Sequence, residues 1–373
     1  MDDMKRREFL KKGIGAGILA GGSVFTGGCP GPAPFMPTAH AASVAAIRGT
    51  NLADMARDAL DAFGGAGAIV NPGERVFIKP NFGGVGMVRY NPITEGDSTK
   101  PEIVLAVVEE CLKAGAREVL VGEAGQVSRW NWGDVYTLDG TQTMREAVDR
   151  LNRSYRGQVI LSCLNSESPG WDTVPSYNRC GFVRVTELMT RADKVISLPA
   201  LKTHRWTQIT GAMKNFVGVT PLAEYGVAGA GMRVMLHQQG IEQSFLDIVR
   251  AVQPDFTIID CSICCEGNGP HVLPGYWGTT VDMRERLGDW FLLASTDLAA
   301  ADATAARVIS HDPAQVNHLQ MAYNQGLGQI LEEEIELVGE SLDTLRMYWE
   351  PAEQTQGFLE VIVPGFHLLT DSR

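Results

Sequence analysis

Residues 194–216 read Lys194-Val-Ile-Ser-Leu-Pro-Ala-Leu-Lys-Thr-His-Arg-Trp-Thr-Gln-Ile-Thr-Gly-Ala-Met-Lys-Asn-Phe216. The apolar run over 194–198 predicts a buried strand, and the run over 210–217 predicts a helix. Two lysines, a histidine, an asparagine and three threonines follow this strand before Phe216. In an open α/β sheet, ligands bind beyond the carboxyl ends of the strands. The stretch therefore predicts a ligand site, suited to an anion, at the end of a buried strand.

On both sides of this stretch, apolar strand patterns alternate with helix patterns. Apolar strands separated by helices indicate a parallel sheet covered on both faces. We expect an α/β fold with a mainly parallel sheet and helices on both faces. One domain over 42–373 and two Rossmann-like lobes, 42–165 and 166–373, both fit the pattern. The expected strands are 75–79, 118–121, 158–164, 194–198, 256–260, 290–293, 335–338 and 359–363.

The helix patterns carry recognisable start and stop signals. Thr99-Lys-Pro-Glu102 resembles a capping box with proline in the first turn, and Gly115 is expected to end the helix that it opens. The remaining expected helices are 144–154, 186–192, 210–217, 241–252, 298–309 and 313–325.

The bulk composition is that of a globular protein: 373 residues, 45% hydrophobic and 20% charged, with a formal net charge of -12. Phosphate backbones are usually bound by basic surfaces, so this charge argues against a nucleic-acid partner. A protein with a negative net charge can still contain a small basic pocket for an acidic ligand.

Residues 1–41 have the features of an export signal. Lys5-Arg-Arg-Glu-Phe-Leu-Lys-Lys12 precedes a mildly apolar, glycine-rich run, and Ala39-His-Ala41 supplies a small-x-small cleavage site. Paired arginines are typical of the twin-arginine route, so we expect that export machinery as a partner and a periplasmic location. Lipid anchoring at Cys29 is the less favoured alternative, because Thr26 stands where a lipobox has an aliphatic residue. We expect no membrane span after cleavage at Ala41, because no later run is long and apolar enough.

The residues after the central strand are suited to binding and proton transfer. Lys202 and His204 lie two apart, so in extended chain they share a face. A lysine, here Lys202 or Lys214, can hold a carboxylate or phosphate as a point charge. A histidine can move a proton near neutral pH or bind metal. The alternative is that the lysines are solvated and His204 caps a helix, but four such residues with Asn215 favour a site.

Other candidates follow other strands. Glu123 ends the strand 118–121 and could act as acid, base or metal ligand. Glu266 and Asn268, in Glu266-Gly-Asn-Gly-Pro270, form a turn that could enter the same crevice, although a self-capped turn explains them too. His237 could join the site or lie on the surface.

The cysteines are compatible with a metal or redox site but also with other roles. Cys261, Cys264 and Cys265 continue the strand 256–260, and Cys-x-x-Cys spacing fits metal or redox use. No second pair has matching spacing, so buried thiols or a disulfide formed after export are the alternatives. No ferredoxin-type iron–sulfur run is present, and the cofactor stays unknown, with a metal ion as one option.

Several elements occur together in a familiar order: Ile78-Lys-Pro-Asn81, Gly122-Glu123, Leu201-Lys-Thr-His204, Thr210-Gly-Ala-Met-Lys-Asn215 and Glu266-Gly-Asn-Gly-Pro270. Together with 297–303 they resemble the domain of unknown function 362 family, from about residue 76 to 340. That family has no settled activity, and some members look fused to ferredoxin-like segments that this chain lacks. The resemblance implies site residues of unknown role: Lys79, Asn81, Lys202, His204, Lys214, Asn215, Glu266 and Asn268.

Two hypotheses for the function follow. The first is an exported, redox or metal-assisted enzyme in which Lys202 and Lys214 hold a small anion, His204 transfers a proton, and Glu266 acts as acid, base or metal ligand. The second is a ligand-binding or accessory protein for a periplasmic redox system, which uses the same crevice without chemistry.

Overall fold

The computed structural model describes residues 36–38, 40–85, 93–226, 233–272 and 277–353. Within them, the main sheet has eleven strands, eight of which follow the order β13-β1-β12-β10-β7-β2-β3-β4; β8 and β11 pair with β10, and β9 pairs with β8. Their bounds are β1 Ala42–Gly49, β2 Arg75–Pro80, β3 Glu118–Glu123, β4 Gln158–Cys163, β7 Lys194–Leu198, β8 Ala200–His204, β9 Gln208–Thr210, β10 Phe256–Glu266, β11 Thr279–Asp282, β12 Trp290–Ser295 and β13 Ile335–Gly339. A separate antiparallel pair is β5 Trp171–Pro175 and β6 Phe182–Thr186.

The sheet is mainly parallel, which confirms the predicted fold class. Strands β10, β7, β2, β3 and β4 pair in parallel, as do β1 and β13. Strand β12 is the exception in the main path, because it runs antiparallel to both β1 and β10. Strands from 42–165 and from 166–373 therefore share one sheet.

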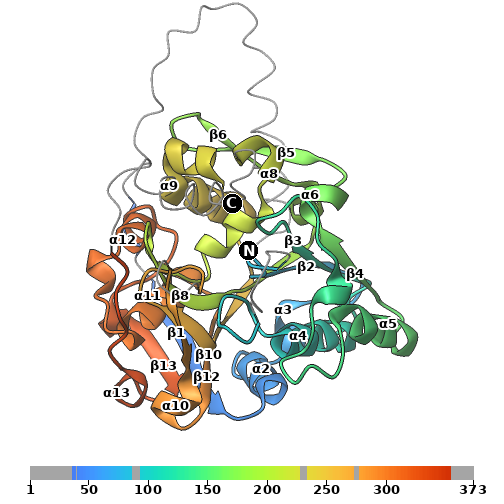
Figure 1. The fold of residues 1–373 in the computed structure, drawn as a ribbon, viewed down its shortest axis with the longest axis horizontal. Helices are drawn as coiled ribbons and strands as arrows, with labels where there is room; N and C mark the ends of the chain where they lie inside the picture. The colour runs from blue at the N-terminus through green and yellow to red at the C-terminus, as the bar shows by residue number, and fades with distance from the viewer. Residues whose placement is uncertain (1–35, 39, 86–92, 227–232, 273–276, 354–373) are drawn as a thin grey trace, which may run out of the picture.

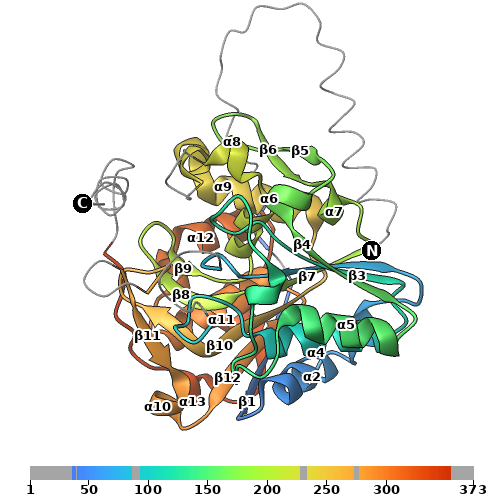
Figure 2. The same ribbon diagram turned by 45° about the vertical axis from the view of Figure 1, so that its right-hand side comes forward.

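Helices cover both faces of this sheet (Figure 1). On one face α2, α4 and α5 pack in a row (Figure 2). On the other face α11 and η2 contact the sheet, and α9 packs against η2. Buried apolar side chains of all these elements form one continuous core. The α-helices are α2 Leu52–Asp61, α3 Ala66–Ile69, α4 Pro101–Lys113, α5 Met144–Ser154, α6 Leu164–Glu167, α7 Glu187–Thr190, α8 Leu222–Tyr225, α9 Val234–Val252, α10 Met283–Leu287, α11 Leu298–Val308, α12 Asn317–Asn324 and α13 Leu342–Leu345. The 3₁₀ helices are η1 Trp132–Asp134, η2 Lys214–Val219, η3 Pro313–Gln315 and η4 Glu332–Glu334.

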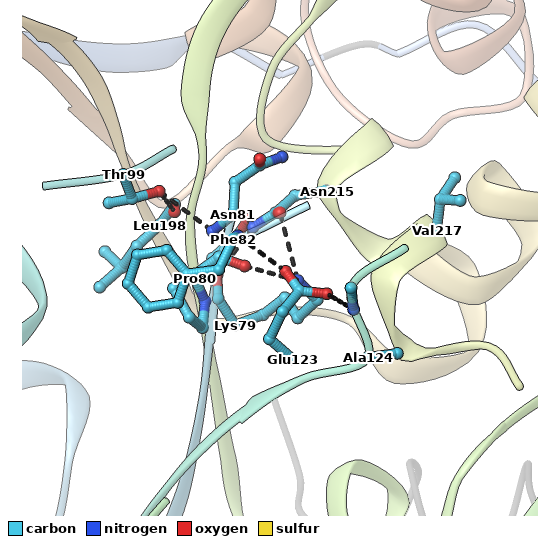
Figure 3. Close-up of polar contacts among 12 residues, drawn as sticks. Lys79, Pro80, Asn81, Phe82, Thr99, Glu123, Ala124, Leu198, Asn215 and Val217 are labelled. Carbon is cyan, nitrogen blue, oxygen red and sulfur yellow. Dashed lines mark hydrogen bonds and ion pairs between the residues drawn. The ribbon is translucent and has the colours of Figure 1, made fainter. Parts of the chain in front are cut away.

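Local capping explains several helix boundaries. Helix α5 begins at a reciprocal capping box, in which Thr143 and Glu146 each accept from the other's backbone N–H. Asp297 caps α11 by accepting from Ala300 N. The predicted capping box at Thr99 is wrong. Thr99 Oγ1 instead donates to Leu198 O and accepts from Asn81 N, which ties the start of α4 to β7 and β2 (Figure 3).

The segment after the central strand also differs from the prediction. Residues 200–210 continue as a hairpin of β8 and β9, and the predicted helix 210–217 is a 3₁₀ helix, η2, over Lys214–Val219. The physical reason lies in tertiary contacts, because β8 pairs with β10 and Asp302 holds the turn before η2. Sequence periodicity does not register either interaction.

Some predictions concern residues that the structure does not describe. The strand 359–363 and residues 1–35 of the expected signal, with Cys29, lie outside the described residues. Strand β1, which the sequence patterns did not indicate, begins at Ala42 and lies between β12 and β13. In the described part of the chain, no helix has the length and apolar character needed to cross a membrane.

Candidate functional site

A pocket lies where β2, β3 and β8 end at the carboxyl edge of the sheet, the position at which open α/β folds bind ligands. Its cavity volume is about 90 Å³, and it is partly open to solvent. Eight sequence-predicted site residues line it: Lys79, Asn81, Glu123, Lys202, His204, Lys214, Asn215 and His237. The structure therefore brings together residues separated by up to 158 positions in the chain (79 to 237).

Lys79 and Glu123 form a buried ion pair at the floor of the pocket (Figure 3). Lys79 Nζ lies 2.6 Å from Glu123 Oε2, and both side chains are almost completely buried. Burial lowers the pKa of Lys79, while the charge of Glu123 acts in the opposite direction. Since Lys79 also donates to Pro80 O, this lysine is held by the protein itself.

The backbone and Asn215 complete the surroundings of this pair. Glu123 accepts from Phe82 N at 3.0 Å and from Gly125 N at 2.8 Å. Asn215 Nδ2 donates to Lys79 O at 2.7 Å and so joins η2 to β2. Gly218 lies so close that a Cβ there would fall 2.6 Å from Glu123 Oε1 and 2.7 Å from Lys79 Nζ. The pair is a fixed part of the pocket floor.

Lys202 is also paired within the protein. Its Nζ donates to Asp97 Oδ1 at 2.9 Å, to Asp97 O at 2.6 Å and to Asn81 Oδ1 at 3.1 Å. Asp97 Oδ2 lies 2.6 Å from His271 Nδ1, so one carboxylate joins a lysine and a histidine. The sequence analysis missed Asp97 as a site residue, because it follows no strand. Only the folded structure shows that Asp97 belongs to a buried polar run, residues 97–100.

Lys214 differs from the other two lysines. It lines the pocket and is partly buried, yet across the described residues no hydrogen bond or ion pair reaches its ammonium group. Burial lowers the pKa of Lys214 to about 7, and the charge of Lys202 acts in the same direction. Near neutral pH, Lys214 therefore exchanges a proton readily and has a position free for a ligand.

Two of the histidines that line the pocket, His204 and His237, favour their neutral form. Trp206 N donates to Nδ1 of His204 at 3.1 Å, so the neutral ring carries its proton on Nε2. Burial and nearby Lys214 hold the pKa of His204 well below its ordinary value, and lower that of His237 to about 3. The ring of Trp206 lies between them, with centroids 5.3 Å from His204 and 4.7 Å from His237. In this state His204 is a hydrogen-bond donor.

Asp302 positions the turn that carries Lys214. Its carboxylate accepts from Ala212 N at 2.5 Å and from Met213 N at 3.1 Å. Burial raises the pKa of Asp302 to about 7. Asp302 lies within the helix pattern 298–309, and its contact with a residue 90 positions away gave no local signal.

Arg233, Trp206 and Trp277 also line the pocket and were not among the sequence candidates. Arg233 is 5% exposed and donates to the carbonyl oxygens of Thr220 and Gly125. Burial lowers its pKa to about 10. The described lining thus holds four basic side chains and two carboxylates; the basic ones are Lys79, Lys202, Lys214 and Arg233. This excess of positive charge favours the binding of an anion.

Glu266 and Asn268 are not among the residues that line the pocket. Glu266 forms a two-point ion pair with Arg286, with contacts of 2.9 and 2.5 Å, and accepts from Glu350 N. Asn268 Oδ1 accepts from Glu353 N at 2.8 Å. Both residues therefore join the turn after β10 to the segment after α13, and their predicted roles in the site have no support from this geometry.

Cys261, Cys264 and Cys265 are buried free thiols within β10. Burial raises the pKa of Cys264 well above its ordinary value and that of Cys265 to about 12, so the thiols stay protonated. Where the structure describes the chain, no group of three or more His, Cys, Asp or Glu side chains is placed to hold a metal ion. The donor set around these cysteines does not fit the predicted metal site.

The proteins that resemble this chain include a curated relative and distant solved structures. The chain is 28% identical to a thylakoid-associated protein of Synechocystis sp. over 283 residues, 73% of this chain and 74% of that protein. The lactate racemase apoprotein from Thermoanaerobacterium thermosaccharolyticum aligns at 11% identity with a TM-score of 0.36, over 61% of this chain and 54% of that one. A Thermotoga maritima protein aligns at 11% identity with a TM-score of 0.34, over 75% and 59%. The matches span little more than half of these two structures, and similarity at this level transfers no function.

The match to a family covers the pocket itself. Residues 76–307 match the family described as Domain of unknown function (DUF362). This range includes β2 except its first residue, the whole of β3, β7, β8 and β10, and all the residues that line the pocket. The sequence resemblance is thereby confirmed, and the chain belongs to the DUF362 family.

Proposed function

We propose that this protein is an enzyme that acts on a small anionic molecule bound in the pocket. The observation that carries the proposal is Lys214, a basic side chain on the pocket lining with no partner in the described residues. The lining also has more basic than acidic groups, and it lies at the edge where α/β sheets bind ligands. Lys79 and Lys202 are already paired with carboxylates, so they shape the pocket while Lys214 meets the ligand.

The roles of the other lining residues follow from their contacts. Arg233 donates three N–H groups to the backbone carbonyl oxygens of Thr220 and Gly125. A guanidinium group has five N–H donors, so two remain to bind an anion. His204 offers Nε2–H to a ligand oxygen, since its Nδ1 already accepts from Trp206 N. Transfer of a proton by His204, the role first predicted, requires protonation of a ring whose pKa is strongly lowered. Hydrogen-bond donation is the better supported role.

A binding or accessory protein is the second candidate, and one observation favours it. Both carboxylates in the described lining, Asp97 and Glu123, are engaged by lysines, and Glu266 lies outside the lining. The described pocket therefore offers no unengaged carboxylate as a general base. A carrier of a small anion, serving a periplasmic redox system, would need none.

Export is proposed with either function. The twin arginines at residues 6 and 7 and the small-x-small site before Ala42 support passage by the twin-arginine route to the periplasm. That route carries folded proteins, which is compatible with a ligand or cofactor bound before export.

The experiment that tests the proposal compares ligand binding with turnover. Thermal stabilisation of the purified protein would be measured with phosphate, acetate, oxalate and pyruvate, followed by mass spectrometry of each mixture after incubation. We expect stabilisation by at least one of these anions, its loss in Lys214→Met, and its retention in Lys113→Met, which changes an exposed lysine on α4. Binding that survives Lys214→Met would contradict the proposed site. Binding without conversion, unchanged in His204→Ala, would favour the carrier.

A further inference from the structure

Lys214 is distinguished from its neighbours by what it does not contact. Lys79 Nζ is 2.6 Å from Glu123, and Lys202 Nζ is 2.9 Å from Asp97, so both amines already have a carboxylate partner. Lys214 is the first residue of η2, and its amine donates to no acceptor in the described chain. A lysine kept in a pocket without a carboxylate partner is the arrangement in which the neutral amine is most accessible.

The titratable groups around Lys214 come from three elements, β8, α9 and α12. Lys202 on β8 opposes its protonation, and Glu242 on α9 favours it. The rings of His204, His237 and His318 are held neutral by burial, with Lys214 as a further cause.

Glu242 does not serve as a close partner of Lys214. Its Oε1 lies 4.0 Å from His318 Nδ1, and its Oε2 accepts from Asn317 Nδ2. Burial raises the pKa of Glu242 itself. The balance of these groups places the pKa of Lys214 at about 7, so much of the amine is neutral at physiological pH.

We propose that Lys214 is a nucleophile that forms an imine with the carbonyl group of a small carbonyl-bearing carboxylate, such as a 2-oxo acid. The inference rests on the proposed function, since it requires that the pocket binds a small anion, and it adds the chemical class of that anion. The carboxylate would lie toward Arg233, and the carbonyl oxygen would accept from Nε2–H of His204.

The step balances without an oxidant or reductant. The Nζ lone pair forms a bond to the carbonyl carbon, and the C=O π electrons move to oxygen. A proton passes from nitrogen to that oxygen, and a second proton from solvent lets it leave as water. The nitrogen lone pair forms the C=N bond as the C–O bond breaks, and the products are a protonated imine on Lys214, which keeps the second amine proton, and one water molecule. His204 stabilises the oxygen by hydrogen bonding and keeps its own proton.

The experiment uses pyruvate and glyoxylate as probes, with borohydride to reduce any imine to a stable secondary amine. Oxamate has nearly the shape and charge of pyruvate, but its amide carbonyl does not condense with amines, so it reports anion binding alone. Intact mass would measure the adduct, and peptide mapping would locate it. We expect one adduct per chain, located at Lys214, whose rate of formation rises with pH through about 7.

Two variants keep the result interpretable. Lys214→Arg retains a cation that cannot lose its proton, so we expect roughly tenfold less adduct with thermal stabilisation by oxamate preserved. Lys113→Arg, on the exposed surface of α4, should form as much adduct as the unaltered protein. Circular dichroism of Lys214→Arg checks that it folds. If that variant is unfolded, peptide mapping of the unaltered protein decides the question alone.

The outcomes separate this inference from the function on which it rests. Stabilisation by oxamate and pyruvate without any adduct at Lys214 overturns the imine and leaves the anion pocket. Adduct spread over surface lysines, or equal in Lys214→Arg, also overturns it. If the probes cause no stabilisation and form no adduct, both proposals are overturned.

Discussion

The contrast between paired and unpaired lysines defines the pocket at the scale of single residues. Lys79 and Lys202 lie on neighbouring parts of the sheet edge, and each is held by a carboxylate from another loop or strand. Breaking a buried ion pair leaves one charge without compensation, whereas an exposed pair loses little. The two kinds of lysine should therefore respond differently to the same substitution.

Lys79→Met should lower the free energy of unfolding by about 3–5 kcal/mol, because it leaves Glu123 buried without its counter-ion. Lys113→Met removes an exposed lysine that pairs with Glu110 and should cost less than about 1 kcal/mol. Urea denaturation of both variants measures the difference. Equal losses would show that the Lys79–Glu123 pair has no special weight in the fold.

The lowered pKa of Lys214 predicts how stability changes with pH. Between about 7 and 10.5, the unfolded chain keeps this amine protonated while the folded chain does not. The unfolded state binds more protons, so this group makes stability rise with pH across that range. Lys214→Met should flatten the rise in melting temperature between pH 7 and 9, and Lys113→Met should not. An unchanged slope in Lys214→Met would argue that the amine titrates normally.

The same group predicts the pH dependence of anion binding. Protonated Lys214 attracts an anion and the neutral amine does not, so affinity for a non-condensing anion such as oxamate should fall as pH rises through about 7. Calorimetric titration at pH 6 and pH 8.5 would measure it. Affinity that stays constant in this range would place the anion away from Lys214.

At the scale of elements, the turn before η2 positions Lys214. Asp302 on α11 accepts from the N–H groups of Ala212 and Met213, and Gly211 leaves room for that carboxylate. A Cβ at Gly211 would lie 2.0 Å from Asp302 Oδ1, and moving the buried carboxylate away would weaken its hydrogen bonds to Ala212 N and Met213 N. The turn and the helix therefore fix each other.

Gly211→Ala should thus destabilise the protein by about 1–3 kcal/mol, the usual cost of forcing extra atoms into a packed interior. Gly67→Ala is the matched control. Gly67 lies in α3, where a Cβ meets nothing within 4 Å, and alanine there should be neutral or stabilising by about 0.5–1 kcal/mol. Thermal unfolding distinguishes the two, and a neutral Gly211→Ala would mean that Asp302 can release the turn.

At the scale of the whole molecule, an acidic chain encloses a pocket with an excess of basic side chains. The net charge of -12 does not draw anions to the surface, so selection of an anion depends on the pocket. The fold places that pocket at one edge of a sheet assembled from strands between residues 42 and 339. The site therefore depends on strands and loops from separate parts of the chain.

The location of the protein is a prediction at this scale. Replacing Arg6 and Arg7 by lysine should strongly reduce export, because the twin-arginine route reads the paired arginines. Cell fractionation and immunoblotting would measure the periplasmic share against that of the unaltered chain. As a control, Lys11→Arg and Lys12→Arg preserve charge and should leave export unchanged. An undiminished periplasmic share after the Arg6/Arg7 replacement would contradict the route.

Particular residues show how far the sequence determined this protein. The apolar runs at 75–79 and 194–198 and the helix pattern over 144–154 are local patterns, and each appears in the structure as the expected strand or helix. Lys79, Lys202 and Lys214 could be identified as candidates because they follow strands or accompany family elements, and all three line the pocket. Local spacing suffices for such features because burial and hydrogen bonding within an element depend on near neighbours.

Only the tertiary structure decided which candidates meet and in what state. Asp97 reaches Lys202 across 105 positions and Glu123 reaches Lys79 across 44, so pairing leaves Lys214 as the lysine without a partner in the described pocket. Glu266, equally prominent in the sequence, is joined to Arg286 outside the lining. The physical reason is that charge state and access depend on desolvation and on partners brought from distant segments, which no local pattern records.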